Sequence, residues 1–371
     1  MASILAVPPR ECPREQCEVD PPHQAAPDAR SRNRARLWRR PPWKQDLRLS
    51  VYTGVSGSTE RRKTRPLLRA GRKPALMSRE AVVRWLLLLL VGLVDWVWMG
   101  WAGFHIGPGV VQSIGFISLL ISISIFYFYT ARDDRIMHFA HFGAQYLALF
   151  AVLTVLSYLA VSTNAPLVDP EFDAIDKALG LDWLAWTEWV VGHPVLRKGL
   201  LVAYASLPLQ ALFGYIYNVH SRANWRNTEI WWITFVSALA TISISAFVPA
   251  ISAWVYYGLS SMADFPHMQH FEALRDGTMR LIGFTDAQGL VQLPSFHTIL
   301  AIMFTYNLRH NRWFFSAAVI LNLALVISCP TEGGHYFVDL AAGAVVAAAT
   351  IWGVRGIGGS LGLCFRPIEQ Q

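Results

Sequence analysis

The chain has 371 residues, of which 53% are hydrophobic and only 15% are charged. This composition excludes a soluble globular protein, because the surface of such a protein requires about 25% charged residues. The net charge of +7 belongs to one part of the chain: residues 1–77 hold 17 Lys/Arg and 7 Asp/Glu, whereas residues 78–371 hold 15 and 18. The hydrophobic part is therefore slightly acidic, and the basic balance says nothing about its partners.

Residues 1–77 are rich in Arg, Pro and Ser and carry no sustained apolar period, which is typical of a disordered segment. This segment is either a basic arm for anionic lipid or nucleic acid, or it does not belong to the native product, which would then begin at Met77. We favour the second alternative, because Met77 is followed by a short polar stretch and then by the first apolar run. We accordingly expect no nucleic-acid partner.

Eight hydrophobic stretches follow in the chain, and we interpret each of them as a membrane helix. A bilayer core of about 30 Å requires about 20 apolar residues in a helix. The predicted spans are residues 85–104, 110–130, 140–162, 197–218, 230–257, 296–308, 313–329 and 336–354, of which the sixth and seventh are short. The sequence therefore predicts an all-α polytopic membrane bundle of about eight spans.

One segment between the third and fourth spans has a different pattern. In residues 172–192, large apolar side chains alternate with Asp, Glu and Lys, and the segment includes Trp186 and Trp189. This mixture favours a helix that lies at the membrane surface over one that crosses the membrane.

Positive charge divides the loops into two sets. One set, together with the C-terminal tail, contains Arg132, Arg135, Arg222, Arg226, Arg309, Arg312, Arg355 and Arg366. The opposite set comprises residues 105–109, 163–196, 258–295 and 330–335 and has few Lys or Arg for its length. Because positively charged loops remain in the cytoplasm, we predict cytoplasmic N- and C-termini and place the second set on the outer face.

Two histidines and one aspartate at the outer face form the candidate chemical site. His297 ends the segment Pro294–His297, in which a polar loop enters a helix with a favourable start signal. His335 begins the last span directly after a Gly-Gly pair, which permits close approach of the backbone to a ligand. Asp339 follows His335 by four residues, so both side chains share one helix face.

This combination of side chains suits chemistry at phosphorus. A carboxylate one turn from His335 fixes one imidazole nitrogen and leaves the other free and basic, as a nucleophile requires. The second histidine, His297, can donate a proton to a leaving alkoxide. Pairing with His335 also explains why Asp339 is tolerated inside a span. A zinc site made by the same three residues is disfavoured, because no fourth ligand and no Cys-x-x-Cys pair accompany them.

The segments Pro294–His297 and His335–Asp339 resemble the second and third signature motifs of the type 2 phosphatidic acid phosphatase (PAP2) superfamily. Residues 130–355 are similar to its branch typified by inositol phosphorylceramide synthases, and Ala273–Gly277 resembles bacterial members of that branch. The resemblance implies a six-helix PAP2-like core within the bundle, a bacterial inner-membrane location and an active site on the periplasmic side.

The same resemblance assigns roles to individual residues. It implies that His335 is the nucleophile that forms a phospho-histidine, that Asp339 orients it, and that His297 protonates the leaving group. Ser295 and Gly334, which belong to the two motifs, are expected to contact the substrate. The implied substrate is a phospholipid or lipid phosphate in contact with membrane lipids, and neither a metal nor a cofactor is expected.

The cationic residues of the superfamily motifs are missing from this chain. The first motif, a Lys followed by Arg-Pro, has no clear counterpart, and Ser328 and Cys329 stand where the third motif begins with Ser-Arg. These departures disfavour a plain phosphatase and favour the transferase-like branch. Transfer of a phosphoryl group still requires positive charge around its oxygens, and we expect Arg275 and Arg280 of the outer loop to supply it. The remaining histidines of that loop, His267 and His270, either touch a head group or form an interfacial polar pair, and we favour the second interpretation.

The predicted organisation has four parts: a disordered basic segment at 1–77, two additional transmembrane helices in 78–130, a PAP2-like catalytic membrane domain at 131–355, and a tail at 356–371. We expect a lipid phosphotransferase or phosphatase that acts at the outer membrane face.

The alternative is a non-catalytic lipid-binding or transport protein on the same scaffold. In that protein the intramembrane acids Asp95 and Asp339 would serve transport, although a hydrogen bond from Asp95 to another helix is an equally good interpretation. The sequence shows no inverted repeat of the kind that many transporters contain, which argues against this alternative.

Overall fold

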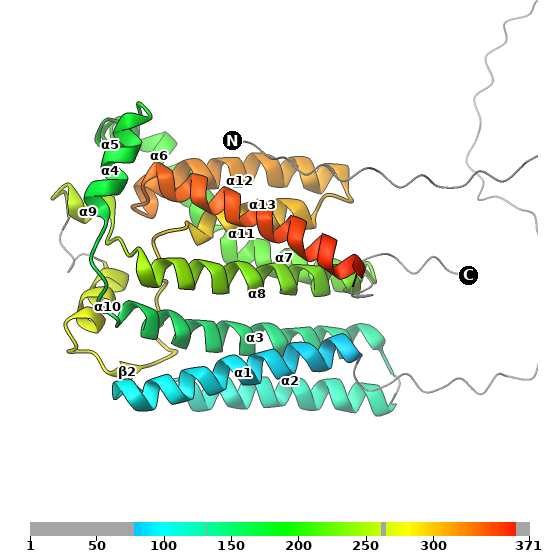
Figure 1. The fold of residues 1–371 in the computed structure, drawn as a ribbon. Helices are drawn as coiled ribbons and strands as arrows, with labels where there is room; N and C mark the ends of the chain where they lie inside the picture. The colour runs from blue at the N-terminus through cyan, green and yellow to red at the C-terminus, as the bar shows by residue number, and fades with distance from the viewer. Residues whose placement is uncertain (1–77, 131, 261–264, 361–371) are drawn as a thin grey trace, which may run out of the picture. The chain divides into compact units, whose positions relative to one another are not determined.

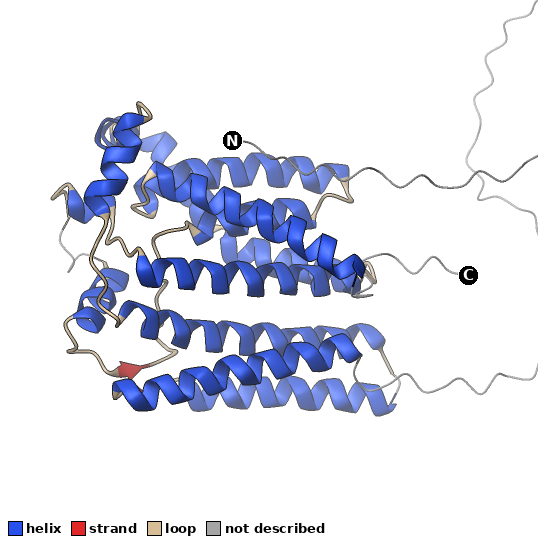
Figure 2. Ribbon diagram, viewed as in Figure 1, coloured by secondary structure: helices blue, strands red, loops and turns tan. Residues whose placement is uncertain are grey.

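The computed structural model describes residues 78–130, 132–260 and 265–360, which belong to one compact unit. The predictions made for residues 1–77 and for the tail beyond residue 360 lie outside these residues. Nearly all of the described chain is helical (Figures 1 and 2). In chain order its elements are α1 (Arg79–Ala102), β1 (His105–Ile106), α2 (Val110–Thr130), α3 (Asp134–Val161), α4 (Asp169–Ala178), α5 (Trp183–Val191), α6 (Pro194–Ala205), α7 (Leu207–His220), α8 (Asn224–Phe247), α9 (Ala253–Tyr256), α10 (Pro266–Arg275), β2 (Leu281–Ile282), α11 (Phe296–Asn307), α12 (Arg312–Glu332) and α13 (Phe337–Ser360).

The predicted all-α membrane class is confirmed, but the number of spans differs from eight. Six described helices are long and apolar enough to cross a membrane: α1, α2, α3, α8, α12 and α13. A seventh span is obtained if α6 and α7, which meet at an angle of 44°, are counted together. The difference arises at α11, whose 12 residues extend only about 18 Å and do not cross a core of about 30 Å.

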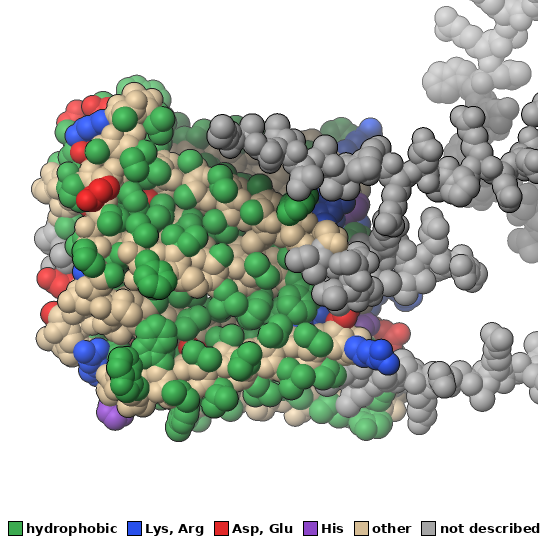
Figure 3. All heavy atoms as spheres, viewed as in Figure 1, with side chains coloured by type: hydrophobic (Ala, Val, Ile, Leu, Met, Phe, Trp, Pro, Cys, Tyr) green, Lys and Arg blue, Asp and Glu red, His purple; other side chains and the backbone are tan. Residues whose placement is uncertain are grey.

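Hydrophobic side chains cover the middle of the face shown in Figure 3, whereas charged side chains gather toward its two ends. Large apolar residues on the outside of the bundle are unusually exposed, with 67% exposure for Leu89, 82% for Val111 and 80% for Trp352. Water would make such a surface costly, while lipid would not. The chain is therefore an integral membrane protein.

The spans form two groups that meet along α3 and α8. α3 packs against α1 and α2 on one side and against α8 on the other, and α8 also contacts α11 and α13 (Figure 1). The chain reverses repeatedly, so α4, α5, α9 and α10 gather at one end of the bundle, close to where α12 ends and α13 begins. This end carries the loops that sequence analysis assigned to the outer face.

The surface segment predicted at 172–192 consists of two short helices, α4 and α5, and not of one helix. Gly180 separates them in a left-handed conformation with φ 75°, which glycine adopts without steric cost. Asp182 then starts α5, because its carboxylate accepts a hydrogen bond from the Ala185 N–H at 3.0 Å.

A two-residue strand pair, which sequence analysis did not predict, ties the α1–α2 connection to the long outer loop. His105 and Ile106 pair in parallel with Leu281 and Ile282. The Gly107 N–H donates to the Ile282 carbonyl at 2.8 Å. The loop that leads into α11 is therefore anchored on the N-terminal helices.

Candidate active site

His335 and Asp339 meet where α12 passes into α13. His335 lies in the short link before α13, and its Nδ1 is 3.3 Å from the Asp339 Oδ2. The same carboxylate oxygen accepts a hydrogen bond from the Tyr336 N–H at 3.0 Å. Both side chains are buried, with 3% exposure for His335 and none for Asp339. The i, i+4 pairing expected from the sequence is therefore present in the structure.

Gly334 shapes the link but does not line the cavity beside it. Its φ of 65° is left-handed, and a Cβ at this position would lie 2.0 Å from the Ser252 Oγ. Its carbonyl accepts hydrogen bonds from the Ala253 N–H at 2.9 Å and from the Gln292 Nε2 at 2.7 Å. These contacts show why glycine is required here, and they assign Gly334 to the framework that holds His335.

His297 stands opposite His335 in the first turn of α11. The two ring centroids are 6.0 Å apart, with 64° between the ring planes. On its other side His297 stacks on Tyr204 of α6, at a centroid distance of 4.5 Å and an angle of 15°. Tyr204 has no motif around it, so sequence analysis did not single it out.

Ser295 is fully buried and starts α11. Its hydroxyl accepts a hydrogen bond from the Thr298 N–H at 3.4 Å, and its own N–H donates to the Asp339 carbonyl at 3.0 Å. The two motifs are thus joined through their backbones. Ser295 does not line the cavity described below, although a substrate contact was predicted for it.

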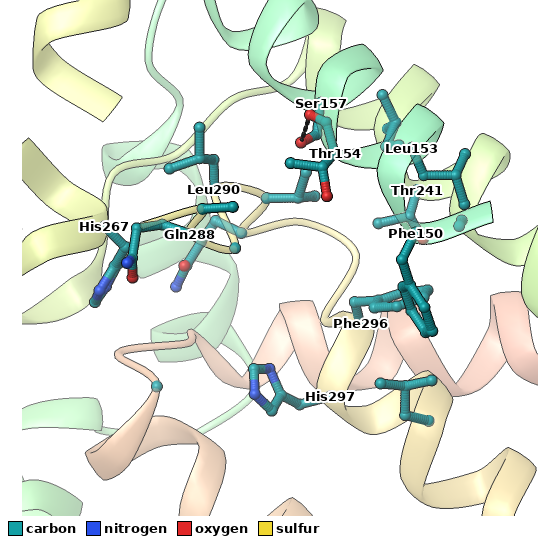
Figure 4. Close-up of a pocket in the computed structure, with 18 of the residues that line it drawn as sticks. Phe150, Leu153, Thr154, Ser157, Thr241, His267, Gln288, Leu290, Phe296 and His297 are labelled. Carbon is teal, nitrogen blue, oxygen red and sulfur yellow. Dashed lines mark hydrogen bonds between the residues drawn. The ribbon is translucent and has the colours of Figure 1, made fainter. Parts of the chain in front are cut away.

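A cavity of about 460 Å³ opens between the two groups of helices, and both His297 and His335 line it. Figure 4 shows His297 together with other residues of the lining. Its walls come from α3, α6, α8, α10, α11, Gly333, His335 and the loop 287–292. The side chains of Thr154, Ser157, Thr234 and Thr241 provide hydroxyls on an otherwise largely apolar wall. A third histidine, His267 of α10, also lines the cavity, whereas His270 does not. The position of His267 fits the alternative in which this histidine touches a head group.

No Lys or Arg is present among the described residues that line this cavity. Arg275 donates from Nη2 to the Ala165 carbonyl at 2.8 Å and borders a separate hollow. Arg280 lies over the ring of Phe104, 4.8 Å from its centroid. The structure therefore does not bring the two arginines predicted to hold phosphate together with the histidines.

Burial lowers the pKa values of the histidines His335 and His267 in this cavity. It lowers the pKa of His335 to about 4, against a hydrogen bond with the main chain of Gln292 that raises it. The pKa of His267 is also lowered, first by burial and then by the proximity of His335. Both rings are thus neutral at pH 7, and a bound anion would favour their protonated forms.

Two carboxylates of α4 hold the residues around His335 and were missed by sequence analysis. Asp176 accepts hydrogen bonds from the N–H groups of Phe337 and Val338, at 2.7 and 2.9 Å. Asp169 accepts from the Tyr336 hydroxyl at 3.0 Å and from the Ile251 N–H. The only available signal was a run of acids spaced three and four apart in a segment assigned to the surface.

The described residues add no observation in favour of a metal site. Within residues 78–130, 132–260 and 265–360, no three His, Cys, Asp or Glu side chains are grouped as metal ligands. Cys329, which occupies the position of the missing arginine, is buried and its Sγ lies 3.3 Å from the Leu325 carbonyl. The Cys329 carbonyl accepts hydrogen bonds from the Gly333 and His335 N–H groups, so Cys329 stabilises the backbone of the link.

The fold and the cavity together define a polytopic helical membrane protein with a buried site of histidines and one paired carboxylate. Residues 170–353 match the family model described as the PAP2 superfamily, so this part of the chain is a PAP2 superfamily domain. Comparisons with the curated proteins and with the solved structures give no significant match. The superfamily implies an activity of the lipid phosphatase or phosphotransferase kind. The particular branch and the predicted domain boundary at residue 131 stay predictions.

Proposed function

We propose that this protein cleaves or transfers a phosphate ester of a membrane lipid through a phospho-histidine formed on His335. The observation that carries the proposal is the placement of a buried, neutral His335 beside Asp339, facing His297 across a cavity open to a lipid-sized molecule. The match of residues 170–353 to the PAP2 superfamily supports it independently.

In the first step, the Nε2 lone pair of His335 attacks phosphorus and the ester P–O bond breaks. The Nδ1–H of His335 donates to Asp339, which stabilises the positive charge that develops on the ring. His297 enters this step in its protonated form, which the bound phosphate anion favours, and gives that proton to the leaving alkoxide. In the second step, an oxygen of water or of an acceptor alcohol attacks phosphorus, the P–N bond breaks, and His297 receives the proton.

The lack of Lys and Arg in the cavity bears on the substrate. A phosphomonoester carries close to two negative charges, whereas a phosphodiester carries one, and an anion in an apolar cavity is costly without cations. Among the described residues of the lining, His267 and His297 are the only side chains that can supply positive charge near His335. We therefore favour a phosphodiester lipid, whose head group is transferred, over a lipid phosphate monoester.

The loop charges support an outer location for this site. The arginines of the loops between the other helix ends, among them Arg132, Arg222 and Arg309, lie at the end of the bundle opposite to the link at His335. Under the positive-inside rule that end is cytoplasmic. We propose that substrate lipids reach the cavity from the outer leaflet.

The test uses the purified full-length chain in lipid nanodiscs with phosphorus-labelled phosphatidic acid, phosphatidylinositol and phosphatidylglycerol. Each donor is supplied with and without ceramide or diacylglycerol as acceptor. We expect an acid-labile label on the protein and release of a lipid alcohol. His335→Asn should eliminate the label and lower kcat by about 10⁴-fold or more, as loss of a nucleophile does in other enzymes.

His297→Ala should lower kcat by roughly 10²–10⁴-fold, the usual contribution of a general acid. His193→Ala is the matched control, because His193 is an exposed histidine at the same end of the bundle and lies outside the cavity. Turnover that survives in the folded His335→Asn protein refutes the nucleophile assignment. If no donor labels the wild-type protein, the non-catalytic lipid-binding alternative stands.

A further inference from the structure

Asp95 is a buried acid of α1 that the proposed reaction does not use. It is only 4% exposed, and neither oxygen of its carboxyl has a hydrogen-bond partner among the described residues. Asp169 and Asp176, which are buried to a similar extent, each accept several hydrogen bonds. A carboxyl buried in a membrane span without a partner is costly, so its presence indicates that a group other than the described residues satisfies it.

A small cavity of about 150 Å³ lies against this carboxyl. It is bordered by α1, α3, the start of α2, β1 and the segment around β2, and Asp95 supplies the only side-chain oxygen among the described residues that line it. A buried water needs two to four polar partners, which this lining does not offer. A cation would equally lack further oxygen ligands. The cavity instead fits an apolar molecule that carries a single hydrogen-bonding group.

One further cavity connects this site with the candidate active site around α3. Ala151 borders both the Asp95 cavity and a groove of about 390 Å³ between α2 and α3. Phe150 and Thr154 border both this groove and the cavity of the histidines. In the outer loop, Phe284 and Ala287 make the same two connections. The three hollows are therefore neighbours, and the groove between them is mainly apolar, with Gln112, Ser113 and Thr154 as its polar lining residues.

We propose that the Asp95 cavity binds the hydroxyl end of a neutral lipid alcohol whose acyl chain lies in the groove between α2 and α3. The bilayer supplies such molecules, and a hydroxyl can both donate to and accept from the orphaned carboxyl. The role of this lipid, as the alcohol released from His335 chemistry or as the acceptor, rests on the proposed function. The binding itself does not, because it requires no turnover.

The experiment measures binding with a photoactivatable diacylglycerol that carries a diazirine in one acyl chain. The full-length protein is studied in phosphatidylcholine nanodiscs, both with native His335 and as His335→Asn, so that labelling is read without catalysis. We expect labelled peptides from α1 and from the facing parts of α2 and α3. Unlabelled diacylglycerol should compete about tenfold more strongly than its deoxy analogue, in which hydrogen replaces the hydroxyl; this ratio corresponds to about 1.4 kcal/mol.

Asp95→Leu should weaken the binding of the probe by about tenfold, the effect expected for loss of one hydrogen bond to a buried acid. Asp95→Asn keeps a hydrogen-bonding group and should retain most of the labelling. Glu80→Leu, on the same helix but outside the cavity, is the matched control and should bind as the wild type does.

Three results would overturn the proposal. The first is wild-type labelling that is absent from α1 and α3, and the second is an Asp95→Leu protein that binds the probe as tightly as the wild type. The third, which needs no variant, is a deoxy analogue that competes as well as diacylglycerol. Binding that persists in His335→Asn while all phospholipid donors fail to react would leave this site standing and refute the proposed function alone.

Discussion

Asp176 offers a direct way to test how the nucleophile is positioned. It lies on α4, at 1% exposure, and reaches across to the start of α13. Its two oxygens accept from the N–H groups of Phe337 and Val338, at 2.7 and 2.9 Å. Helix starts leave these N–H groups without intrahelical partners, so Asp176 serves as the cap of the helix that carries Asp339. We expect Asp176→Asn to weaken the positioning of His335 and Asp339 without weakening the binding of lipid in the cavity.

The magnitude follows from what the amide removes. Asparagine keeps one acceptor oxygen, but its NH2 group would face the other backbone N–H, and two donors cannot form a hydrogen bond. The negative charge at the helix start is also lost. A hydrogen bond to a charged group contributes about 1.5–3 kcal/mol, and the charge at a helix N-terminus contributes up to about 2 kcal/mol. Asp176→Asn should therefore lower the free energy of unfolding by about 2–4 kcal/mol in total. A displacement of about 1 Å at a catalytic group lowers the rate by about 10²-fold, and we expect kcat to fall by that amount.

The assay is the initial rate of lipid-phosphate transfer or hydrolysis in nanodiscs, with KM measured alongside kcat and folding checked by thermal unfolding. KM should change by less than about threefold, because neither α4 nor α13 contributes a residue to the described lining of the cavity. Asp173→Asn is the matched control: Asp173 is one turn from Asp176 on α4 but bonds to Lys177 and Tyr257 and not to α13. An Asp176→Asn enzyme with normal kcat, or an equal loss in Asp173→Asn, would refute the reasoning.

Three further predictions concern the immediate surroundings of the histidines. Gly334→Ala should lower the thermal unfolding midpoint, because the left-handed backbone costs roughly 1–2 kcal/mol and the new Cβ meets the Ser252 Oγ at 2.0 Å; adding Ser252→Ala should restore part of the loss, and no recovery would argue against the clash. Tyr204→Ala should lower kcat by about tenfold through loss of its stacking on His297, worth roughly 0.5–1.5 kcal/mol, whereas Tyr204→Phe should retain it; equal rates for the two variants would contradict this role. The pKa of His335 is about 4 in the folded protein and 6.5 when unfolded, so the unfolded chain binds the proton more readily and stability falls as pH drops from 6.5 to 4. When the free energy of unfolding is measured against pH, it should fall by about 3 kcal/mol less in His335→Asn than in the wild type. An equal fall in both proteins would show that His335 does not titrate in this way.

The sequence by itself determined the features that depend on neighbours in the chain. The apolar runs fixed the all-helical membrane class, because their length and lack of charge leave no other way to bury the backbone in lipid. Spacing of four residues predicted that His335 and Asp339 meet, and they do, although His335 lies in the link before α13 and not on the helix itself. The motif residues before His297 likewise indicated a helix start, and Ser295 does cap α11.

Only the tertiary structure decided which distant residues surround the site. Asp176 caps a helix that begins 161 residues later, and Tyr204 stacks on a ring 93 positions away, and no local pattern encodes such contacts. The same holds for Arg275 and Arg280, which the sequence placed near the phosphate because they share a loop with the site, whereas the fold turns them to Ala165 and Phe104. Periodicity reports how a segment meets lipid or protein, but packing between segments selects the partner of each side chain. In this protein that packing makes histidines the only basic side chains among the described residues that line the cavity.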